Sequence, residues 1–152
     1  MDNQKLIIEQ IDRKIIKFNE LKDIKIPEQG WIKSIRIALK MTLKQLGNRL
    51  NITPQSVKEI EDREKNGSLT LNILRKFGEV MQMKLVYGYI PEKGSLNEII
   101  NAKAYEIAKS IVMRTAKNME LEEQSVLQEQ LDKAIEEKKN ELIKEIPKYL
   151  WD

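Results

Sequence analysis

Cysteine and histidine are both absent from this chain of 152 residues. Their absence excludes disulfides, thiolate nucleophiles, imidazole bases and the commonest zinc ligands. Catalysis would have to rest on carboxylates, lysine, serine or tyrosine. The sequence has no metal-ligand cluster, no glycine-rich phosphate loop and no nucleophile paired with a base. We therefore expect a protein that is not an enzyme and that needs no metal or other cofactor.

Long apolar segments are lacking as well. The longest apolar stretch, Leu85 to Ile90, is interrupted by Gly88 and is too short to cross a bilayer. The first residues lack the apolar region of a signal peptide. These features favour a cytoplasmic protein with no membrane partner. The chain length suits one domain with appended helices.

What the chain does contain is two short helical patterns on either side of a tight corner. The first pattern begins at Thr42, a suitable N-cap, and Gln45 follows at the spacing of a capping box. Gly47 lies where a second helix must cross closely. The apolar face of this first helix consists of Leu43, Leu46 and Leu50.

The second helical pattern follows the corner Asn51-Ile52. Thr53 suits its N-cap and Pro54 its first helical position. Val57 and Ile60 face inward, so the polar side chains between them face outward. This arrangement predicts a helix-turn-helix that presents its second helix to DNA.

The outward side chains of the second helix have donors and acceptors that base edges require. Gln55 suits a bidentate adenine contact, and Glu59 can accept from a cytosine amino group. Ser56 and Lys58 can reach either bases or backbone. The alternative interpretation is that these exposed polar residues only make a short helix soluble.

Other residues of the motif suit DNA phosphates. Thr53 and the backbone donors at the start of the second helix form one such group, and Lys44 is another. Asn66-Gly67 indicates the C-cap of the second helix. Arg63 and Lys65 would then contact the DNA backbone.

Charge along the chain agrees with this placement, although the net charge is only +3. Residues 31–65 contain eight lysines and arginines but four acidic residues. Residues 95–152 contain nine basic and twelve acidic residues. Binding to phosphates requires positive charge near the duplex, so the distribution directs residues 31–65 toward DNA. The alternative is that most of these charges solvate exposed helix faces.

The spacing of Gly47, Ile52, Thr53 and Val57 resembles the Cro and lambda-repressor (XRE) family of helix-turn-helix domains. This chain has Leu43 where that family usually has glutamine. The resemblance implies that the positions of Pro54, Gln55 and Glu59 read bases, Pro54 through apolar contact with a thymine methyl group. The candidate DNA-binding residues are therefore Thr42, Lys44, Thr53, Pro54, Gln55, Ser56, Lys58, Glu59, Arg63 and Lys65.

A longer resemblance covers most of the chain. Five segments are similar to the proteins called mobile mystery protein A: 49–61, 67–71, 85–91, 119–124 and 150–152. The resemblance implies a DNA-binding regulator that is paired with a Fic-domain protein.

The remaining pattern is mostly helical. Residues 3–22 form an amphipathic arm, and residues 31–41 form a helix whose face of Ile32, Ile35, Ala38 and Leu39 would pack under the helix-turn-helix. A fourth helix follows Thr70 to about Met81, with Leu74, Phe77 and Val80 inward. Capping residues Ser95 and Glu98 open a helix to about Lys117, and a last helix runs from about Leu121 to Ile146.

These elements predict a mainly α fold with four parts. They are an N-terminal helical arm (1–30), a lambda-repressor-like helix-turn-helix domain (31–83), one short β-strand with a linker (84–94) and a C-terminal helical hairpin (95–152). The strand is predicted over residues 84–90, a short run that contains β-branched and aromatic residues and is followed by Pro91.

A lone strand has unpaired backbone groups, so we expect it to pair with the same strand of a second copy. The expected dimerisation residues of this homodimer are Leu85, Val86, Tyr87, Tyr89 and Ile90. The alternatives are that these side chains pack in the core, or that the arm or the hairpin forms the interface.

Two functions remain open. One is a sequence-specific transcriptional regulator, a repressor, that reads palindromic double-stranded DNA as a homodimer through the helix starting at Thr53. The other is an antitoxin-like partner that neutralises a Fic-domain protein and also regulates its own operon. Inhibitory helices of that system resemble Ser/Thr-x-x-x-Glu-Gly/Asn, whereas Ser125 to Glu129 is followed here by Gln130.

Overall fold

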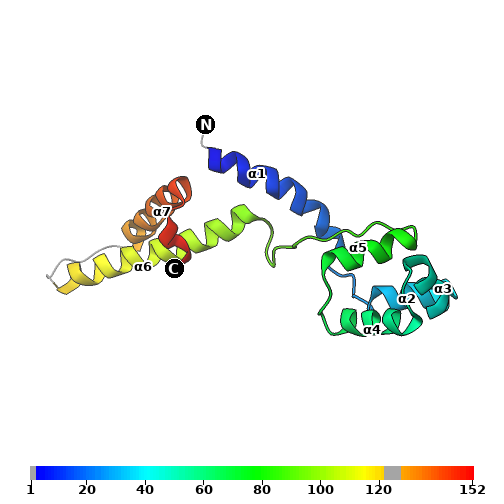
Figure 1. The fold of residues 1–152 in the computed structure, drawn as a ribbon. Coiled ribbons are helices and arrows are strands. Elements are labelled where there is room, and N and C mark those ends of the chain that lie inside the picture. The colour runs from blue at the N-terminus through cyan, green and yellow to red at the C-terminus, as the bar shows by residue number, and fades with distance from the viewer. Residues whose placement is uncertain (1–2, 122–127) are drawn as a thin grey trace. The chain divides into compact units, whose positions relative to one another are not determined.

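The chain is mainly helical, as predicted, in a computed structural model that describes residues 3–121 and 128–152 (Figure 1). It forms two compact units. Leu21–Gly88 form one, which we call the central unit. Met1–Glu20 and Tyr89–Asp152 form the other, which we call the terminal unit. All ten candidate DNA-binding residues belong to the central unit.

The central unit consists of four short helices around one apolar core. They are α2 (Trp31–Ala38), α3 (Leu43–Leu50), α4 (Pro54–Lys65) and α5 (Leu71–Val80). Each helix contributes one fully or almost fully buried side chain, and Met81 completes the cluster. These side chains are Ile32, Leu46, Val57 and Phe77. The inward face that the sequence predicted for α5 is confirmed, because Leu74 and Val80 pack against this core.

Capping residues set the ends of α4 and α5. The helix α4 ends at Lys65 with Asn66 as its C-cap, and Gly67 follows with a φ of 74°. A positive φ is readily adopted by glycine, so the chain turns there. The Thr70 hydroxyl then accepts a hydrogen bond from the Ile73 N–H at 3.3 Å and starts α5. The predicted C-cap at Asn66-Gly67 is therefore confirmed.

The helix α2 is shorter than the sequence predicted. It ends at Ala38, and Lys40 has a φ of 52°, so the chain turns toward α3 before Met41. Ile32 and Ile35 pack in the core as expected. Ala38 and Leu39 do not, because this turn leaves both exposed.

Residues 84–90 do not form the predicted strand, and the described part of the chain has no strand elsewhere. A strand exists only when its backbone pairs with a neighbour. The described residues provide no such neighbour for residues 84–90. The last backbone hydrogen bond before this segment runs from the Met83 N–H to the Gly78 carbonyl at 2.8 Å.

The terminal unit is a helical hairpin with the N-terminal helix packed against it. The hairpin is α6 (Leu96–Leu121) and α7 (Gln128–Glu145), followed by a short 3-10 helix, η2 (Lys148–Trp151). The N-terminal helix is α1 (Asn3–Ile15), and the 3-10 segment η1 (Ile16–Leu21) continues it to the first residue of the central unit. The predicted arm is therefore α-helical only to Ile15. The expected start of the last helix falls partly on residues 122–127, outside the described residues.

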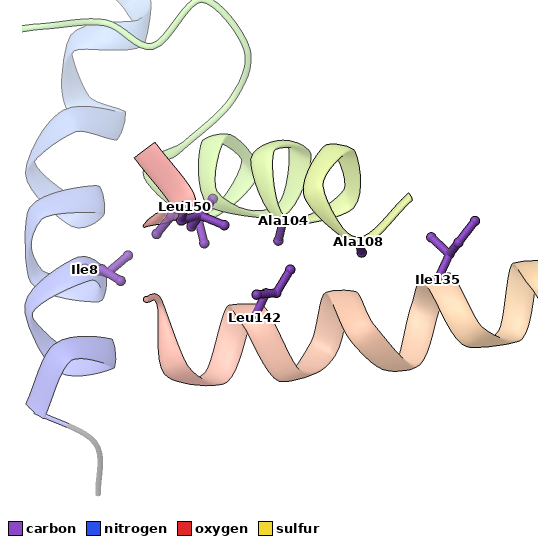
Figure 2. Close-up of a cluster of buried hydrophobic side chains, with 7 residues drawn as sticks. Ile8, Ala104, Ala108, Ile135, Leu142 and Leu150 are labelled. Atoms are coloured by element: carbon purple, nitrogen blue, oxygen red, sulfur yellow. The ribbon is translucent and has the colours of Figure 1, made fainter. Parts of the chain in front are cut away.

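Small side chains allow α6 and α7 to approach closely (Figure 2). Ala104 and Ala108 are fully buried on α6, and Leu142 of α7 points toward them. Ile135 extends this contact along α7. Figure 2 shows Leu150 beside the same cluster and Ile8 pointing toward it from α1. The ends of the sequence thus share one core.

A carboxylate joins α1 to the start of α6. Asp12 accepts hydrogen bonds from the Leu96 N–H at 2.8 Å and the Asn97 N–H at 3.3 Å. The predicted capping box is also present, because Ser95 and Glu98 exchange hydrogen bonds of 3.0 and 3.2 Å. The first backbone donors of α6 are therefore satisfied partly by a residue more than eighty positions earlier.

None of the helices in the described ranges combines the length and apolar character that a membrane span requires.

Candidate nucleic-acid interface

The start of α3 is fixed by a reciprocal pair of hydrogen bonds. The Gln45 N–H donates to the Thr42 hydroxyl at 3.0 Å, and the Thr42 N–H donates to Gln45 Oε1 at 2.8 Å. This is the predicted capping box. The Gln45 side chain closes the box at the start of α3, and Thr42, Lys44 and Gln45 are all exposed there.

The corner between α3 and α4 depends on close backbone contact. Asn51 adopts the left-handed conformation with a φ of 55°, and the Ile52 N–H donates to the Gly47 carbonyl at 3.0 Å. A Cβ on Gly47 would lie 2.6 Å from the Ile52 carbonyl oxygen. Only glycine therefore fits at the crossing, as the sequence predicted.

The first turn of α4 is capped and exposed. The Thr53 hydroxyl accepts from the Ser56 N–H at 3.1 Å and lies 2.9 Å from the Ser56 hydroxyl. Pro54 occupies the first helical turn. The two hydroxyls contact each other, so a phosphate at this end would replace or share that contact. Backbone donors of a first helical turn have no partners within the helix itself.

The outward face of α4 carries the predicted reading residues. Val57 is fully buried and Ile60 is partly buried against the core, and this fixes the rotation of the helix. Of the ten candidate DNA-binding residues, Ser56 is half-buried. The other nine are exposed: Thr42, Lys44, Thr53, Pro54, Gln55, Lys58, Glu59, Arg63 and Lys65.

Arg63 has a contact within the chain that the sequence did not indicate. Its guanidinium donates to the Ser68 carbonyl at 3.0 Å, and the Ser68 hydroxyl donates to the Arg63 carbonyl at 3.3 Å. This pair ties the end of α4 to the next loop. A guanidinium has five N–H donors, so this contact leaves capacity for a phosphate.

A buried ion pair that was not predicted from the sequence holds α4 against α2. Arg36 Nε and one terminal nitrogen donate to the two Glu61 oxygens at 2.5 and 3.1 Å. The other terminal nitrogen donates to the Met41 carbonyl at 3.0 Å. The two side chains are 12% and 3% exposed. Both charges contribute to the charge count of residues 31–65, but they neutralise each other inside the unit.

The pattern contained a signal for this pair. Arg36 follows the buried Ile32 by four residues, and Glu61 follows the buried Val57 by four residues. Residues four positions apart share a helix face, so both charges lie on inward faces. Two opposite charges on inward faces of neighbouring helices predict a buried pair.

A second carboxylate of α4 also contacts α2. Glu64 accepts from the Trp31 N–H at 2.7 Å and the Ile32 N–H at 3.0 Å, and so caps α2, whose N-cap Gly30 has no side chain for this purpose. Gly30 has a φ of 87°, and a Cβ there would lie 2.9 Å from the Glu64 carboxyl carbon. Two acidic residues of α4 are thus satisfied by α2, which leaves Glu59 and Asp62 as its exposed acids.

The described residues contain no group of three acidic side chains placed to hold a metal ion. Searches of family models, curated proteins and solved structures find no match for this chain.

Proposed function

We propose that this chain is a sequence-specific DNA-binding regulator that reads a palindromic operator as a homodimer and represses transcription there. The observation that carries the proposal is the capped start of α4, which follows α3 through a glycine-dependent corner and presents exposed polar side chains. A helix held in this way matches the requirements for reading the major groove.

Each candidate residue has a distinct task under this proposal. Gln55 contacts adenine and Glu59 accepts from a cytosine amino group, while Pro54 contacts a thymine methyl group. Ser56 and Lys58 reach bases or backbone. The remaining residues of the interface contact phosphates: Thr42, Lys44, Thr53, Arg63 and Lys65.

Positive charge supports the same surface. The buried pair Arg36–Glu61 removes one charge of each sign, and Glu64 is occupied at the start of α2. Exposed lysines and arginines therefore outnumber exposed acids over residues 31–65. This excess favours a polyanion and opposes an acidic protein surface.

The homodimer supplies the second reading helix that a palindrome requires. One helix-turn-helix makes few base contacts, whereas two related by a twofold axis read half-sites about 34 Å apart or a multiple of it. We place the dimer contact at residues 85–90, which form a strand only when a second copy supplies its partner.

The direct experiment is selection of bound duplexes from a random pool, followed by binding measurements over a range of salt concentrations. We expect an enriched palindrome and a binding constant that falls steeply with salt. The matched control is the double variant Gln55→Ala and Glu59→Ala, which should keep the salt dependence and lose the enrichment. Steep salt dependence without any enriched sequence in the unmodified protein would contradict base reading.

The resemblance to mobile mystery protein A supports a second candidate, an antitoxin-like partner of a Fic-domain protein. The structural observation that favours it is the terminal unit, which has its own core and contains none of the candidate DNA-binding residues. Part of the imperfect inhibitory motif, Ser125 to Leu127, lies outside the described residues. Titration of the full chain into a Fic-domain protein encoded beside its gene tests this candidate, since inhibition at a defined stoichiometry is expected and unchanged activity would exclude it.

A further inference from the structure

Residues 84–90 combine unpaired backbone with exposed side chains at Val86, Tyr87 and Tyr89, while Leu85 and Ile90 are half-buried. No backbone–backbone hydrogen bond involving residues 84–94 occurs within the described chain. Val86 is 63% exposed, Tyr87 59% and Tyr89 86%. Unpaired backbone beside exposed apolar side chains is typical of a strand that pairs with another chain.

The sequence of this segment is almost the same in both directions. Val86-Tyr87-Gly88-Tyr89-Ile90 has glycine at its centre, tyrosine on each side and a β-branched residue at each end. A twofold axis through Gly88 would therefore place each side chain of one strand opposite a similar side chain of an identical antiparallel strand. An isologous interface must be self-complementary in this way.

We propose that two copies of this chain form a two-stranded antiparallel sheet whose twofold axis passes through Gly88. Val86 then lies opposite Ile90 of the second copy, and Tyr87 lies opposite Tyr89 of the second copy. Aromatic and β-branched residues are favourable cross-strand pairs. The proposal rests on the homodimer of the proposed function and specifies its register.

The surroundings of Val86 and Tyr87 suit these pairs. Val86 borders an apolar groove of about 430 Å³ that Trp31 and Met83 also line, and these two side chains are 45% and 44% exposed. Ile90 of the second copy, placed opposite Val86, would bury apolar surface at the edge of this groove. On the other side, the Arg75 guanidinium lies 5.9 Å from the centre of the Tyr87 ring, so that ring is already positioned.

Neighbouring residues oppose other registers. A twofold axis through Tyr87 would pair Val86 with glycine and Leu85 with Tyr89, and so would lose both matched pairs. Pro91 has no N–H and would lie opposite Leu85 in the proposed register, so the ladder ends there. Gly88 is not among the glycines with positive φ, so an L side chain fits its backbone.

The absence of cysteine makes the register measurable by disulfide trapping in the full-length protein. Residues directly opposite each other have Cα atoms about 4.5–5.5 Å apart, within the range for a disulfide. Gly88→Cys should therefore give a disulfide-linked dimer as the main species after mild oxidation. An equal mixture of Tyr87→Cys and Tyr89→Cys should also cross-link, through one cysteine of each kind.

The single variants provide the matched controls. In the proposed register, the two Cα atoms of residue 87 lie about 8 Å apart, so Tyr87→Cys alone should cross-link several-fold less than Gly88→Cys. Gly88→Ser should remain helical by circular dichroism and dimeric by sedimentation, which shows that the site tolerates a side chain. Glu79→Cys, exposed on α5, measures random collisions.

The cross-linking pattern can overturn the register independently of the DNA-binding proposal. If Tyr87→Cys or Tyr89→Cys alone cross-links more than Gly88→Cys, the twofold axis passes through that residue and the proposed register is wrong. If all three variants sediment as dimers but cross-link no more than Glu79→Cys, the dimer interface lies outside this segment. Gly88 cross-linking without selection of any DNA sequence would support the register and overturn the proposed function. Selection of palindromic DNA without a cross-link at Gly88→Cys would support the proposed function and overturn the register.

Discussion

Different contacts stabilise the interiors of the two units of this protein. The central unit joins α2 to α4 through two carboxylates, Glu61 and Glu64, in addition to its apolar core. The terminal unit relies on a long contact between α6 and α7, in which alanines face leucine and isoleucine. Buried carboxylates therefore add to apolar packing where α2 meets α4, whereas the contact between α6 and α7 is mainly apolar.

This difference indicates where each unit is vulnerable. Buried ion pairs contribute little net stability but are costly to break, because the remaining charge loses its partner. Alanine-lined interfaces lose stability when a large facing side chain is removed and a cavity remains. Each unit contains one of the two tryptophans, Trp31 or Trp151, so a Trp31→Phe or Trp151→Phe background reports the unfolding of one unit at a time.

The largest effect is expected for Glu61→Ala. It leaves the Arg36 guanidinium buried without its carboxylate, and should reduce the unfolding free energy of the central unit by about 3–5 kcal/mol. Denaturant unfolding followed by Trp31 fluorescence measures this loss. The control is the double variant Arg36→Met and Glu61→Leu, which removes both charges and should recover much of the stability. Equal losses in the single and double variants would show that shape, and not the unpaired charge, is responsible.

A pair of core substitutions tests whether the units unfold separately. Leu46 and Leu142 are both almost fully buried, one in each core. Truncation to alanine should cost about 2–5 kcal/mol in each case. Leu46→Ala should lower the denaturant midpoint only of the transition seen by Trp31 fluorescence. Leu142→Ala should lower only the midpoint seen by Trp151 fluorescence. A shift of both transitions by either variant would show that the two units unfold as one.

The range over which contacts act decides how much of each unit can be predicted from the sequence. In the central unit, the decisive signals are local: Thr42 with Gln45, Thr53 with Pro54, and Gly47 at the corner all lie between residues 42 and 54. Capping and turn chemistry act over such short distances, so the helices, the corner and the exposed face of α4 were all predicted. The Arg36–Glu61 pair was missed because charged residues were treated as surface residues.

In the terminal unit, the decisive contacts join residues far apart in sequence. Asp12 caps α6, and Ile8 and Leu150 share a core. A helical pattern shows that α1 has an apolar face but not which partner covers it. The prediction of a strand at residues 84–90 was wrong for a related reason. β propensity describes how well a side chain fits a sheet, but it does not supply the neighbouring strand.

The reading face of the central unit can be tested with two alanine variants. Gln55→Ala should weaken binding to the selected site by about 1–3 kcal/mol and have little effect on random DNA. Lys44→Ala should weaken all sequences alike and reduce the salt slope by about one. Fluorescence anisotropy with selected and random duplexes at several salt concentrations separates the two effects. Equal losses on both duplexes for Gln55→Ala would reassign this residue to the backbone.

The smallest effect is expected at the polar tie of the terminal unit. Asp12→Ala removes the acceptor of the Leu96 and Asn97 N–H groups, and loss of a helix cap typically costs about 0.5–2 kcal/mol. Asp12→Asn keeps one acceptor oxygen and should lose less. Unfolding followed by Trp151 fluorescence in the Trp31→Phe background measures both variants. Because packing by Ile8 remains, α1 should stay attached in each, and hydrogen exchange should increase mainly at the first turn of α6. A loss above that of Leu142→Ala would show that the terminal unit depends on this carboxylate more than on its core.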